Sequence, residues 1–258
     1  MTDDYEFFKQ QILMLTGIEL NCYKEAQMKR RIDSLILRNK CNSYRDYIAL
    51  LKANRDKYEQ FINYLTINVS EFWRNPEQWK LLEDMVIPEL KKKSSVRIWS
   101  AACSTGDEPY SLAMLFSRHF KFSAIDIIAT DIDKQVLQQA VTGIYDEKSL
   151  RALPKNLLEE NLTKISDHAY QINSGLKQCI SFKQHNLLKD PYPAGCDLIV
   201  CRNVLIYFTE DAKNDIYYKF NKALNSDGIL FLGSTEQILY AEKCGLKPIS
   251  SFFYRKIN

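Results

Sequence analysis

The spacing of apolar residues changes near residue 94, and this change most constrains what the chain can fold into. Before it, apolar side chains such as Phe7, Ile12 and Leu15 recur every three or four residues with polar side chains between them, which is the period of an amphipathic helix. After it, short apolar runs alternate with helical stretches. The sequence therefore predicts a helical N-terminal part followed by an α/β domain.

The N-terminal part is expected to contain four helices. The first carries the apolar stripe described above and is interrupted near Gly17 or Asn21, and Ser43 is the expected N-cap of the third. The second, third and fourth helices are expected at residues 24–39, 43–53 and 56–66.

The α/β part is predicted from apolar runs separated by amphipathic segments. The expected strands are VRIWSAA (96–102), IDIIATD (125–131), CDLIVCRN (196–203), GILFLGS (228–234) and FFYRKI (252–257). The expected helices cover residues 109–120, 134–142 and 210–224. Strands that alternate with helices predict a parallel sheet covered on both faces.

A stretch of different character follows the second of these helices. AYQIN (169–173) and QCISFKQ (178–184) are expected to form short strands on either side of Ser174 and Gly175. We interpret residues of about 146–182 as a small β insertion in the α/β domain.

Composition argues against several protein classes. The 35 Lys and Arg residues against 32 Asp and Glu residues give a formal net charge of +3, too close to neutral for the whole protein to bind polyanions. The seven cysteines include no C-x-x-C pair, so neither a disulfide framework nor a zinc site is expected, and the thiols are predicted to be reduced. The start MTDDYEFFKQQ is not typical of a signal peptide, and no apolar run reaches the roughly 18 residues of a membrane span. A cytoplasmic protein without membrane insertion is expected.

The loop after the first expected strand is where a ligand is predicted, because open α/β sheets bind ligands beyond the carboxyl ends of their strands. This loop, CSTGDEPYS (103–111), has the single glycine Gly106 and not the G-x-G-x-x-G pattern that brings backbone amides close to a pyrophosphate. It also carries Asp107 and Glu108, which repel phosphates. A dinucleotide or ATP is therefore not expected here.

A cationic nucleoside suits an acidic loop better. S-adenosylmethionine carries a sulfonium and an ammonium and no phosphate, so Asp107 or Glu108 is suited to bind its amino group. The alternative is that both acids only stabilise the N-terminal end of the helix that Pro109 begins, an effect of about 0.3 to 1 kcal/mol. Asp131, which ends the second expected strand, is placed to accept a hydrogen bond from each of two ribose hydroxyls. It could instead cap the next helix, a role that Asp133 could also fill.

Five segments, in order along the chain, resemble the motif series of the CheR family of chemotaxis-receptor protein-glutamate O-methyltransferases, most closely its Bacillus type. They are LTINVSEFWRN (65–75), WSAACSTGDEPYSLA (99–113), ATDID (129–133), CRNVLIYF (201–208) and GSTEQ (233–237). The resemblance implies a Rossmann-like, S-adenosylmethionine-dependent methyltransferase sheet with helices on both faces, a small β insertion and an all-helical N-terminal domain. It also implies methyl transfer to glutamate carboxylates of chemotaxis receptors (methyl-accepting chemotaxis proteins) for sensory adaptation, which leaves glutamate methyl esters and S-adenosylhomocysteine.

The resemblance also implies which residues form the site. Arg74 would lie beside the reacting groups, Glu108 would bind the methionine amino group and Asp131 would bind the ribose. The full set of implied cofactor contacts is Asn68, Ser70, Arg74, Glu108, Asp131, Asn186, Leu187, Arg202 and Asn203. Ser70 stands where many members have threonine, and Asp107 stands where glutamate is commoner. Both changes retain the functional group, so little consequence is expected.

The implied reaction needs no general base, because a glutamate carboxylate with an ordinary pKa of about 4.3 is already ionised at pH 7. This agrees with the three histidines, His119, His168 and His185, which lie outside the motifs. Arg74 and Tyr207 are the candidate catalytic residues: Arg74 would orient the carboxylate, and Tyr207 would either line the same site or act only in packing. No metal is expected.

The second expected helix offers a basic face. Residues 21–60 hold ten basic and five acidic side chains, a net charge of +5, whereas residues 1–20 have a net charge of −3. This segment is either a solvated face or a surface for glutamate-rich receptor helices, and the family resemblance favours docking. The expected docking residues are Lys24, Lys29, Arg30, Arg31 and Arg38.

These expectations divide the chain into a helical substrate-docking domain (1–75), a linker helix (76–93) and a methyltransferase domain (94–258). The expected partners are the cytoplasmic methylation helices of chemotaxis receptors, and the protein is expected to act as a monomer. The β insertion lacks the Gly-x-Gly turn of tail-binding members, so binding of a receptor's C-terminal pentapeptide is not expected. Two rival functions are a nucleic-acid methyltransferase, disfavoured by the absence of the D/N/S-P-P-Y/F segment common in amine methyltransferases, and an adaptor that binds the cofactor without using it.

Overall fold

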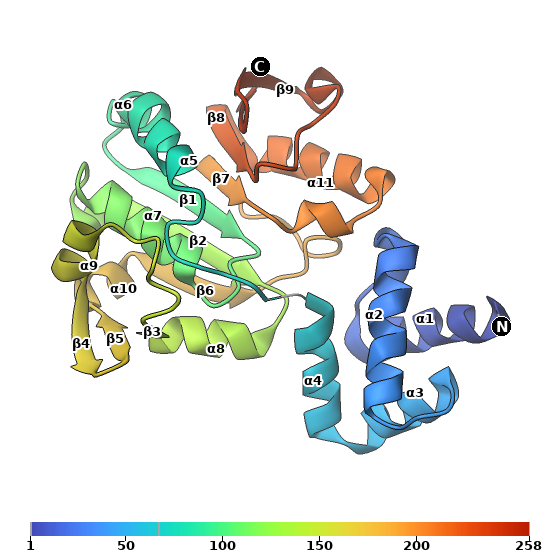
Figure 1. Ribbon diagram of the computed structural model, residues 1–258. Helices are drawn as coiled ribbons and strands as arrows, with labels where there is room; N and C mark the ends of the chain where they lie inside the picture. Colours follow the sequence, from blue (N-terminus) through green and yellow to red (C-terminus); the bar gives the residue numbers. More distant parts are fainter. Residues whose placement is uncertain (1, 67, 258) are drawn as a thin grey trace. The chain divides into compact units, whose positions relative to one another are not determined.

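The computed structural model describes residues 2–66 and 68–257 (Figure 1). The chain forms two units. One contains the residues up to Asn68 together with Ile206–Asp215, and the other contains Val69–Leu205 and the residues from Ile216 onward. The first unit therefore takes in a short segment from late in the sequence, which the pattern of apolar residues did not indicate.

The first unit is built from helices, as predicted. They are α1 (Thr2–Thr16), the short η1 (Leu20–Cys22), α2 (Glu25–Arg38), α3 (Tyr44–Ala53) and α4 (Arg55–Thr66). Ser43 caps α3 as expected, since its hydroxyl accepts a hydrogen bond of 3.1 Å from the backbone N–H of Asp46. The apolar stripe of α1 differs by one position from the prediction. Phe8 is fully buried, whereas Phe7 is half-buried and lies under the guanidinium of Arg45.

Ile206–Asp215 belongs to the first unit through contacts with the segment before α2. This stretch contains the end of η4 (Leu205–Tyr207) and the start of α11 (Glu210–Ala223). The backbone N–H of Lys24 donates to the carbonyl oxygen of Tyr207 at 2.9 Å, and that of Thr209 donates to Cys22 at 2.8 Å. Tyr207 is thus held by its backbone in the helical unit.

The second unit contains a seven-stranded sheet with the order β6-β2-β1-β7-β8-β10-β9. Its strands are β1 (Val96–Ala101), β2 (Ile125–Asp131), β6 (Ile180–Gln184), β7 (Cys196–Cys201), β8 (Leu224–Leu232), β9 (Leu246–Ser250) and β10 (Phe253–Lys256). Five neighbouring strands run parallel, as predicted for a parallel sheet: β6, β2, β1, β7 and β8. In contrast, β10 is antiparallel to both of its neighbours, β8 and β9. β10 is antiparallel to β9 because only two residues separate them, and so short a connection can join neighbouring strands only as a hairpin.

Helices pack on both faces of this sheet. Ile98 of β1 lies in a core shared with α7 (Asp107–Ser117), whereas its neighbour Trp99 faces the other way and packs against Phe220 of α11, with ring centroids 5.4 Å apart. Successive side chains of a strand point to opposite faces, so both faces are covered. On the same side as Ile98 and α7, α8 (Lys134–Thr142) packs Leu137 against Ala129 of β2.

The segment predicted as a linker helix is part of the core of the second unit. It forms α5 (Pro76–Leu81), the π-helical turn η2 (Leu82–Val86) and α6 (Ile87–Leu90). Trp79 and Leu82 on its inner side are fully buried in the same cluster as Ile98. This segment therefore belongs to the core of the unit that contains the sheet.

The small β insertion consists of β3 (Ile144–Asp146), α9 (Lys155–Asn161), β4 (Leu162–Ser166) and β5 (Ala169–Ile172), with the strand order β3-β5-β4. The assignment of QCISFKQ to this insertion was wrong. After α10 (Ser174–Gln178), these residues form β6, which pairs in parallel with β2 as an edge strand of the main sheet. Ile180 and Phe182 pack against its core. No helix among the described residues is long and apolar enough to cross a membrane.

Candidate cofactor site

Tight loops at the carboxyl ends of the central strands bear the predicted site residues. The loop from β1 to α7 turns sharply at Ala102 and Ser104, whose φ angles are 66° and 49°. It then passes Gly106, where φ is 93° and a Cβ atom would lie 2.8 Å from Ala140 Cβ and Tyr145 Oη. The one glycine of this loop is needed for close packing and for its backbone angle, and not for the approach of a phosphate.

Unusual backbone angles gather in these loops. Among the described residues, eight other than glycine have a positive φ, and five of them lie in the candidate site: Trp73, Asn75, Ala102, Ser104 and Asn203. Such angles cost of order 1 to 3 kcal/mol each and persist where surrounding contacts hold them.

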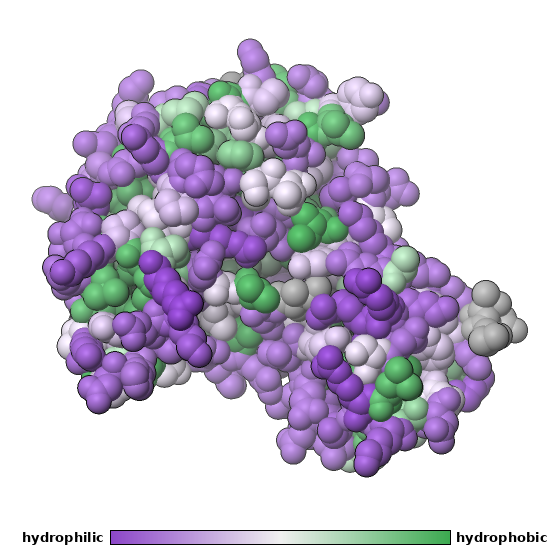
Figure 2. Space-filling model, in the orientation of Figure 1, coloured by the Kyte–Doolittle hydropathy of each residue, from purple (hydrophilic) through white to green (hydrophobic). Residues whose placement is uncertain are grey.

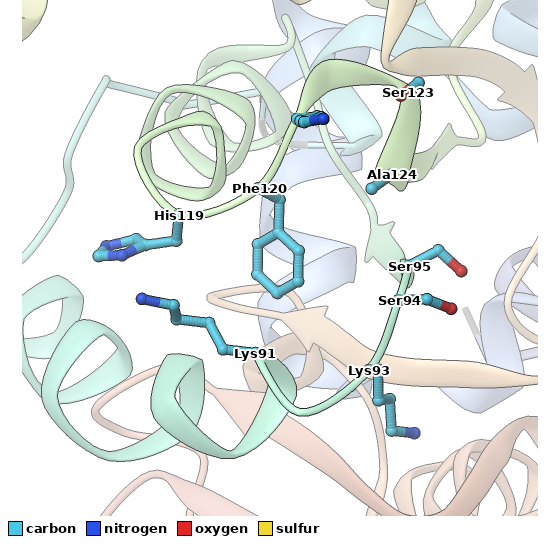
Figure 3. A pocket seen from close by; sticks show the side chains of 9 residues that line it. Lys91, Lys93, Ser94, Ser95, His119, Phe120, Ser123 and Ala124 are labelled. Carbon is cyan, nitrogen blue, oxygen red and sulfur yellow. The ribbon is translucent and has the colours of Figure 1, made fainter.

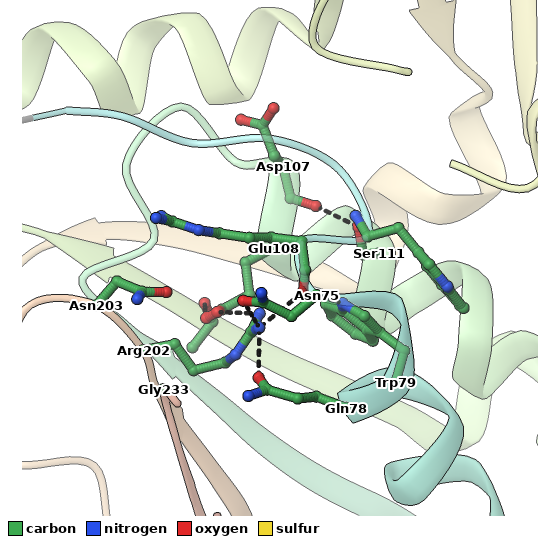
Figure 4. Close-up of polar contacts among 12 residues, drawn as sticks. Asn75, Gln78, Trp79, Asp107, Glu108, Ser111, Arg202, Asn203 and Gly233 are labelled. Carbon is green, nitrogen blue, oxygen red and sulfur yellow. Dashed lines mark hydrogen bonds and ion pairs between the residues drawn. The ribbon is translucent and has the colours of Figure 1, made fainter. Parts of the chain in front are cut away.

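Arg202, which follows β7, connects these loops (Figure 4). Its Nη2 donates hydrogen bonds of 2.7 Å to the backbone carbonyl of Arg74 and to Gln78 Oε1, and its Nη1 lies 3.7 Å from Glu108 Oε2. The guanidinium carbon lies 5.6 Å from the ring centroid of Trp79. Burial lowers the pKa of Arg202, opposed by the Glu108 carboxylate. These contacts of Arg202 are with protein groups and join the loops of the site, and the cofactor contact that the resemblance implied for it stays a prediction.

Glu108 is largely buried at the start of α7. Its Oε1 accepts a hydrogen bond of 2.8 Å from the Ser100 hydroxyl, and its Oε2 faces Arg202. Burial raises the pKa of Glu108, while Arg202 and Ser100 oppose the rise. The carboxylate is therefore held by two neighbours in one orientation.

Asp107, next to it, is a structural residue. Its carboxylate accepts a 2.5 Å hydrogen bond from the Thr105 hydroxyl and another from Ser70, and burial raises its pKa. Its backbone carbonyl accepts from the Ser111 hydroxyl at 2.7 Å, and that hydroxyl accepts from the backbone N–H of Trp73 at 3.2 Å (Figure 4). These bonds tie the segment before α5 to the loop after β1.

Asp131 ends β2 as predicted and is buried. Its two oxygens accept hydrogen bonds from the backbone N–H groups of Ser104 at 2.8 Å and Asp133 at 3.0 Å. Burial raises its pKa to about 6, opposed by those backbone donors. Asp133, and not Asp131, caps α8, through a 2.8 Å hydrogen bond from the N–H of Gln135. The backbone N–H of Ile132 is a third donor. Asp131 thus fixes the loop, and these donors do not use all the lone pairs of its two oxygens.

Asn186 and Leu187 follow β6 at the same edge of the sheet. Asn186 Oδ1 accepts a 2.9 Å hydrogen bond from the N–H of Leu188, and Leu187 is buried. Arg74 is half-buried, and its guanidinium makes a long hydrogen bond of 3.4 Å to the carbonyl of Val69. Asn68 belongs to the first unit, where its amide donates to Thr66 at 2.9 Å.

Unsatisfied polar atoms gather at the site. Among the described residues, six buried side-chain polar atoms have no hydrogen-bond partner, and four of them belong to Gln78, Ser104, Arg202 and Asn203. Buried polar atoms are rarely left without partners, so this grouping indicates a polar ligand. Together with the oriented Glu108 carboxylate, these residues fit a nucleoside that carries an amino group.

Family models match this chain over nearly its whole length. The model of the CheR methyltransferase SAM-binding domain matches residues 68–251, and the model of the CheR methyltransferase all-alpha domain matches residues 3–66. The chain belongs to the CheR methyltransferase family. It is an S-adenosylmethionine-dependent methyltransferase, and the family and fold predicted from its sequence are confirmed.

Relatives in several bacteria carry the same family's name. A chemotaxis protein methyltransferase of Listeria monocytogenes is 42% identical over 98% of this chain and 97% of its own length. One of Borreliella burgdorferi is 34% identical over 86% of this chain and 83% of its own length. Chemotaxis protein methyltransferase 2 of Vibrio cholerae is 31% identical over 98% of this chain and 89% of its own length.

The predicted docking residues of this CheR-family protein differ in solvent exposure and in their contacts with other side chains. Arg30 and Arg38 are exposed on α2, and Lys24 is exposed at its N-cap. Strongly hydrophilic side chains gather over this helix in Figure 2. Lys29 lies 5.3 Å from the ring centroid of Tyr5.

Arg31 is the exception among the docking residues. It donates a short hydrogen bond to the carbonyl of Tyr64 in α4 and stacks on that ring at 4.4 Å. Arg31 therefore holds α2 and α4 together, and these contacts leave only part of its guanidinium available to a partner.

A surface pocket of about 410 Å³ lies elsewhere, at the amino ends of β1 and β2. Figure 3 shows the Phe120 ring between Lys91 and His119 on one side and Ser94 and Ser95 on the other. The basic side chains follow the C-terminal ends of α6 and α7, where cations stabilise the helix dipole. The pocket contains none of the predicted site residues.

The predicted set of site residues lacked Gln78, Trp79, Ser111 and Glu236, whose contacts shape the site. The GSTEQ motif carries part of the family resemblance, but the resemblance implied no role for Glu236. Nothing local in the sequence predicts which backbone amides a distant carboxylate will bind. Phe72 and Trp73, which precede Arg74, are buried in the core of the second unit.

Proposed function

We propose that this protein transfers a methyl group from S-adenosylmethionine to glutamate side chains in the cytoplasmic methylation helices of chemotaxis receptors. The observation that carries the proposal is the match of the chain to both CheR domains, combined with a site that presents an oriented acid and unsatisfied polar atoms. The names of the relatives support chemotaxis receptors as the substrate class.

Glu108 binds the amino group of the cofactor in this proposal, because its carboxylate is held by Ser100 and Arg202 and partly reaches solvent. Asp131 binds the ribose through the lone pairs that the backbone donors leave. The contacts carried over from the family are completed by Asn68, Ser70, Arg74, Asn186, Leu187, Arg202 and Asn203. The bound cofactor supplies a methyl group on a sulfonium, which is activated for displacement.

Arg74 orients the glutamate carboxylate. Its guanidinium makes a long hydrogen bond of 3.4 Å, so little free energy is lost when it turns to a substrate. The ionised carboxylate is itself the nucleophile, and the site needs only to align it with the methyl group and exclude water. Tyr207 is a second candidate contact to the substrate. No general base and no metal ion take part in this proposal.

The exposed basic residues of α2 attract the acidic receptor helices. The protein acts in the cytoplasm as a monomer and does not bind nucleic acid in this proposal. A receptor's C-terminal pentapeptide is not expected to bind, and calorimetry that finds micromolar affinity for that peptide would contradict this part.

The deciding experiment incubates the protein with tritiated S-adenosylmethionine and receptor cytoplasmic fragments, and then applies mild alkali. Carboxyl methyl esters release labelled methanol, whereas N-methyl groups survive. Alkali-stable label on nucleic acid would instead support the rival methyltransferase. Cofactor binding without any transfer would support an adaptor.

A further inference from the structure

Glu236 is a buried carboxylate for which the proposed reaction has no use. Glu236 lies in the loop after β8, and only 4% of its surface is exposed to solvent. Its Oε2 accepts hydrogen bonds from the backbone N–H groups of Asn203 at 2.6 Å and Gly233 at 2.9 Å, and its Oε1 accepts from Leu205 at 2.7 Å. The N–H of Val204 is a further donor. One carboxylate thus binds successive amides of the loop after β7.

The loop that Glu236 binds carries a strained site residue. Asn203 has a φ of 61°, and its buried side-chain Oδ1 has no partner. A carboxylate is well suited to hold successive N–H groups that point the same way. Without that anion, the strained angle at Asn203 would lose its main support.

Gly233 leaves room for this arrangement. A Cβ atom at Gly233 would lie 2.5 Å from Glu236 Oε2 and 2.9 Å from the backbone nitrogen of Asn203. Both atoms belong to the clamp, the set of hydrogen bonds from the backbone N–H groups of residues 203–205 and 233 to the Glu236 carboxylate. An alanine at position 233 would push these partners apart, although the carboxylate itself is retained.

Charge supports the same role. Glu236 lies close enough to Arg202 and Glu108 to affect both pKa values: its charge favours the protonated form of each. Burial raises the pKa of Glu236, and its backbone donors oppose the rise. The carboxylate therefore helps to balance the guanidinium of Arg202 in a buried cluster.

We propose that Glu236 is a positioning residue of the methyl-transfer site, which holds the loop of residues 203–205 so that the Asn203 side chain is presented to the cofactor. This inference rests on the proposed function. Glu236 itself is not expected to touch the cofactor or the substrate.

Two variants test the proposal from opposite sides of the clamp. Glu236→Gln replaces an acceptor oxygen with an NH2 group that faces N–H donors, and Gly233→Ala separates the partners with Glu236 retained. Matched controls are Glu242→Gln at an exposed position of η5 (Ala241–Cys244) and Gly175→Ala, whose Cβ would be 3.4 Å from Phe122. Each is measured for S-adenosylhomocysteine binding by calorimetry and for both KM values.

We expect S-adenosylhomocysteine to bind roughly tenfold or more weakly to both clamp variants, because a misplaced contact of about 1 Å has effects of this size or larger. The KM for the cofactor should rise, and the KM for the receptor fragment should not change. A purely structural role would lower the fraction of folded enzyme and leave both KM values unchanged. Folded Glu236→Gln protein with wild-type affinity overturns the proposal. If Glu236→Gln does not fold, wild-type affinity in Gly233→Ala overturns it.

The wild-type protein separates this inference from the proposed function. Wild-type protein that binds S-adenosylhomocysteine but never methylates receptor fragments contradicts the proposed substrate and leaves the binding test of Glu236 valid.

Discussion

Arg202 Nη2 donates a hydrogen bond of 2.7 Å to the backbone carbonyl oxygen of Arg74, 128 residues earlier in the chain. The same nitrogen donates to Gln78, and Nη1 faces Glu108. One guanidinium therefore joins the segment that presents Arg74 to the loop that presents Glu108. A planar guanidinium with five N–H groups can serve several acceptors at once, which a lysine ammonium cannot do in this geometry.

Arg202→Met is expected to lower the free energy of unfolding by about 3 kcal/mol, because it leaves Glu108 buried without its cation. Chemical denaturation monitored by circular dichroism measures the loss. The double variant Arg202→Met with Glu108→Gln should recover part of it, since the unpaired charge is removed. Arg118→Met removes an exposed ion pair with Glu83 and should change stability by only about 0.5 kcal/mol. Equal losses for Arg202→Met and Arg118→Met would contradict the assigned role.

Arg74→Ala is expected to reduce methyl transfer by roughly 100-fold or more with the fold intact, because the carboxylate loses its orienting partner. Thermal melting should show little change, since the guanidinium makes a long hydrogen bond of 3.4 Å. The control Arg151→Ala removes an exposed arginine from the same unit. Wild-type transfer rates in Arg74→Ala would refute the assignment.

Asp131 should give the protein without cofactor a distinctive pH dependence of stability. Burial raises its folded-state pKa to about 6, above the ordinary value near 4, so the folded state binds the proton more tightly than the unfolded state. Its contribution to stability is therefore fully present below about pH 4 and is lost as the pH rises through about 6.

Comparison of wild type with Asp131→Asn isolates this effect. The stability of wild type relative to the variant should fall by up to about 3 kcal/mol between pH 4 and 7. Urea titrations at several pH values measure the difference. A difference that stays constant across this range would mean that Asp131 keeps an ordinary pKa.

Lys24→Glu with Arg30→Glu should raise the KM for receptor fragments and leave cofactor affinity unchanged, because both side chains are exposed, at the N-cap of α2 and on its first turns. The effect should shrink at high salt, as screening weakens attraction between charges. Lys52→Glu with Lys57→Glu changes the charge of the same unit equally on α3 and α4 and is the matched control. If both pairs raise the KM alike, net charge and not a defined face guides docking.

Local patterns in the sequence were sufficient to predict helices and strands, and to predict at which strand ends the site lies. The helix predicted at residues 134–142 is α8 with the same bounds, and Asp131 ends β2 as expected. These features depend on neighbours within one or two helical turns or on alternation along one strand. The pattern placed Phe7 in the stripe of α1, where Phe8 is the buried residue, because adjacent aromatics leave the helix phase ambiguous.

The amino-acid sequence by itself determined the class of this protein: a helical unit, an α/β unit and a motif series with an acidic, glycine-poor cofactor loop. Only the tertiary structure decided that QCISFKQ joins the main sheet, that Arg31 holds α4, and that Arg202 and Glu236 bind the loops of the site. The physical reason is the same in each case. A helix or strand is favoured by residues close in sequence, whereas the partners of a strand edge, a guanidinium or a buried carboxylate are set by which distant backbone groups the fold brings within hydrogen-bond distance.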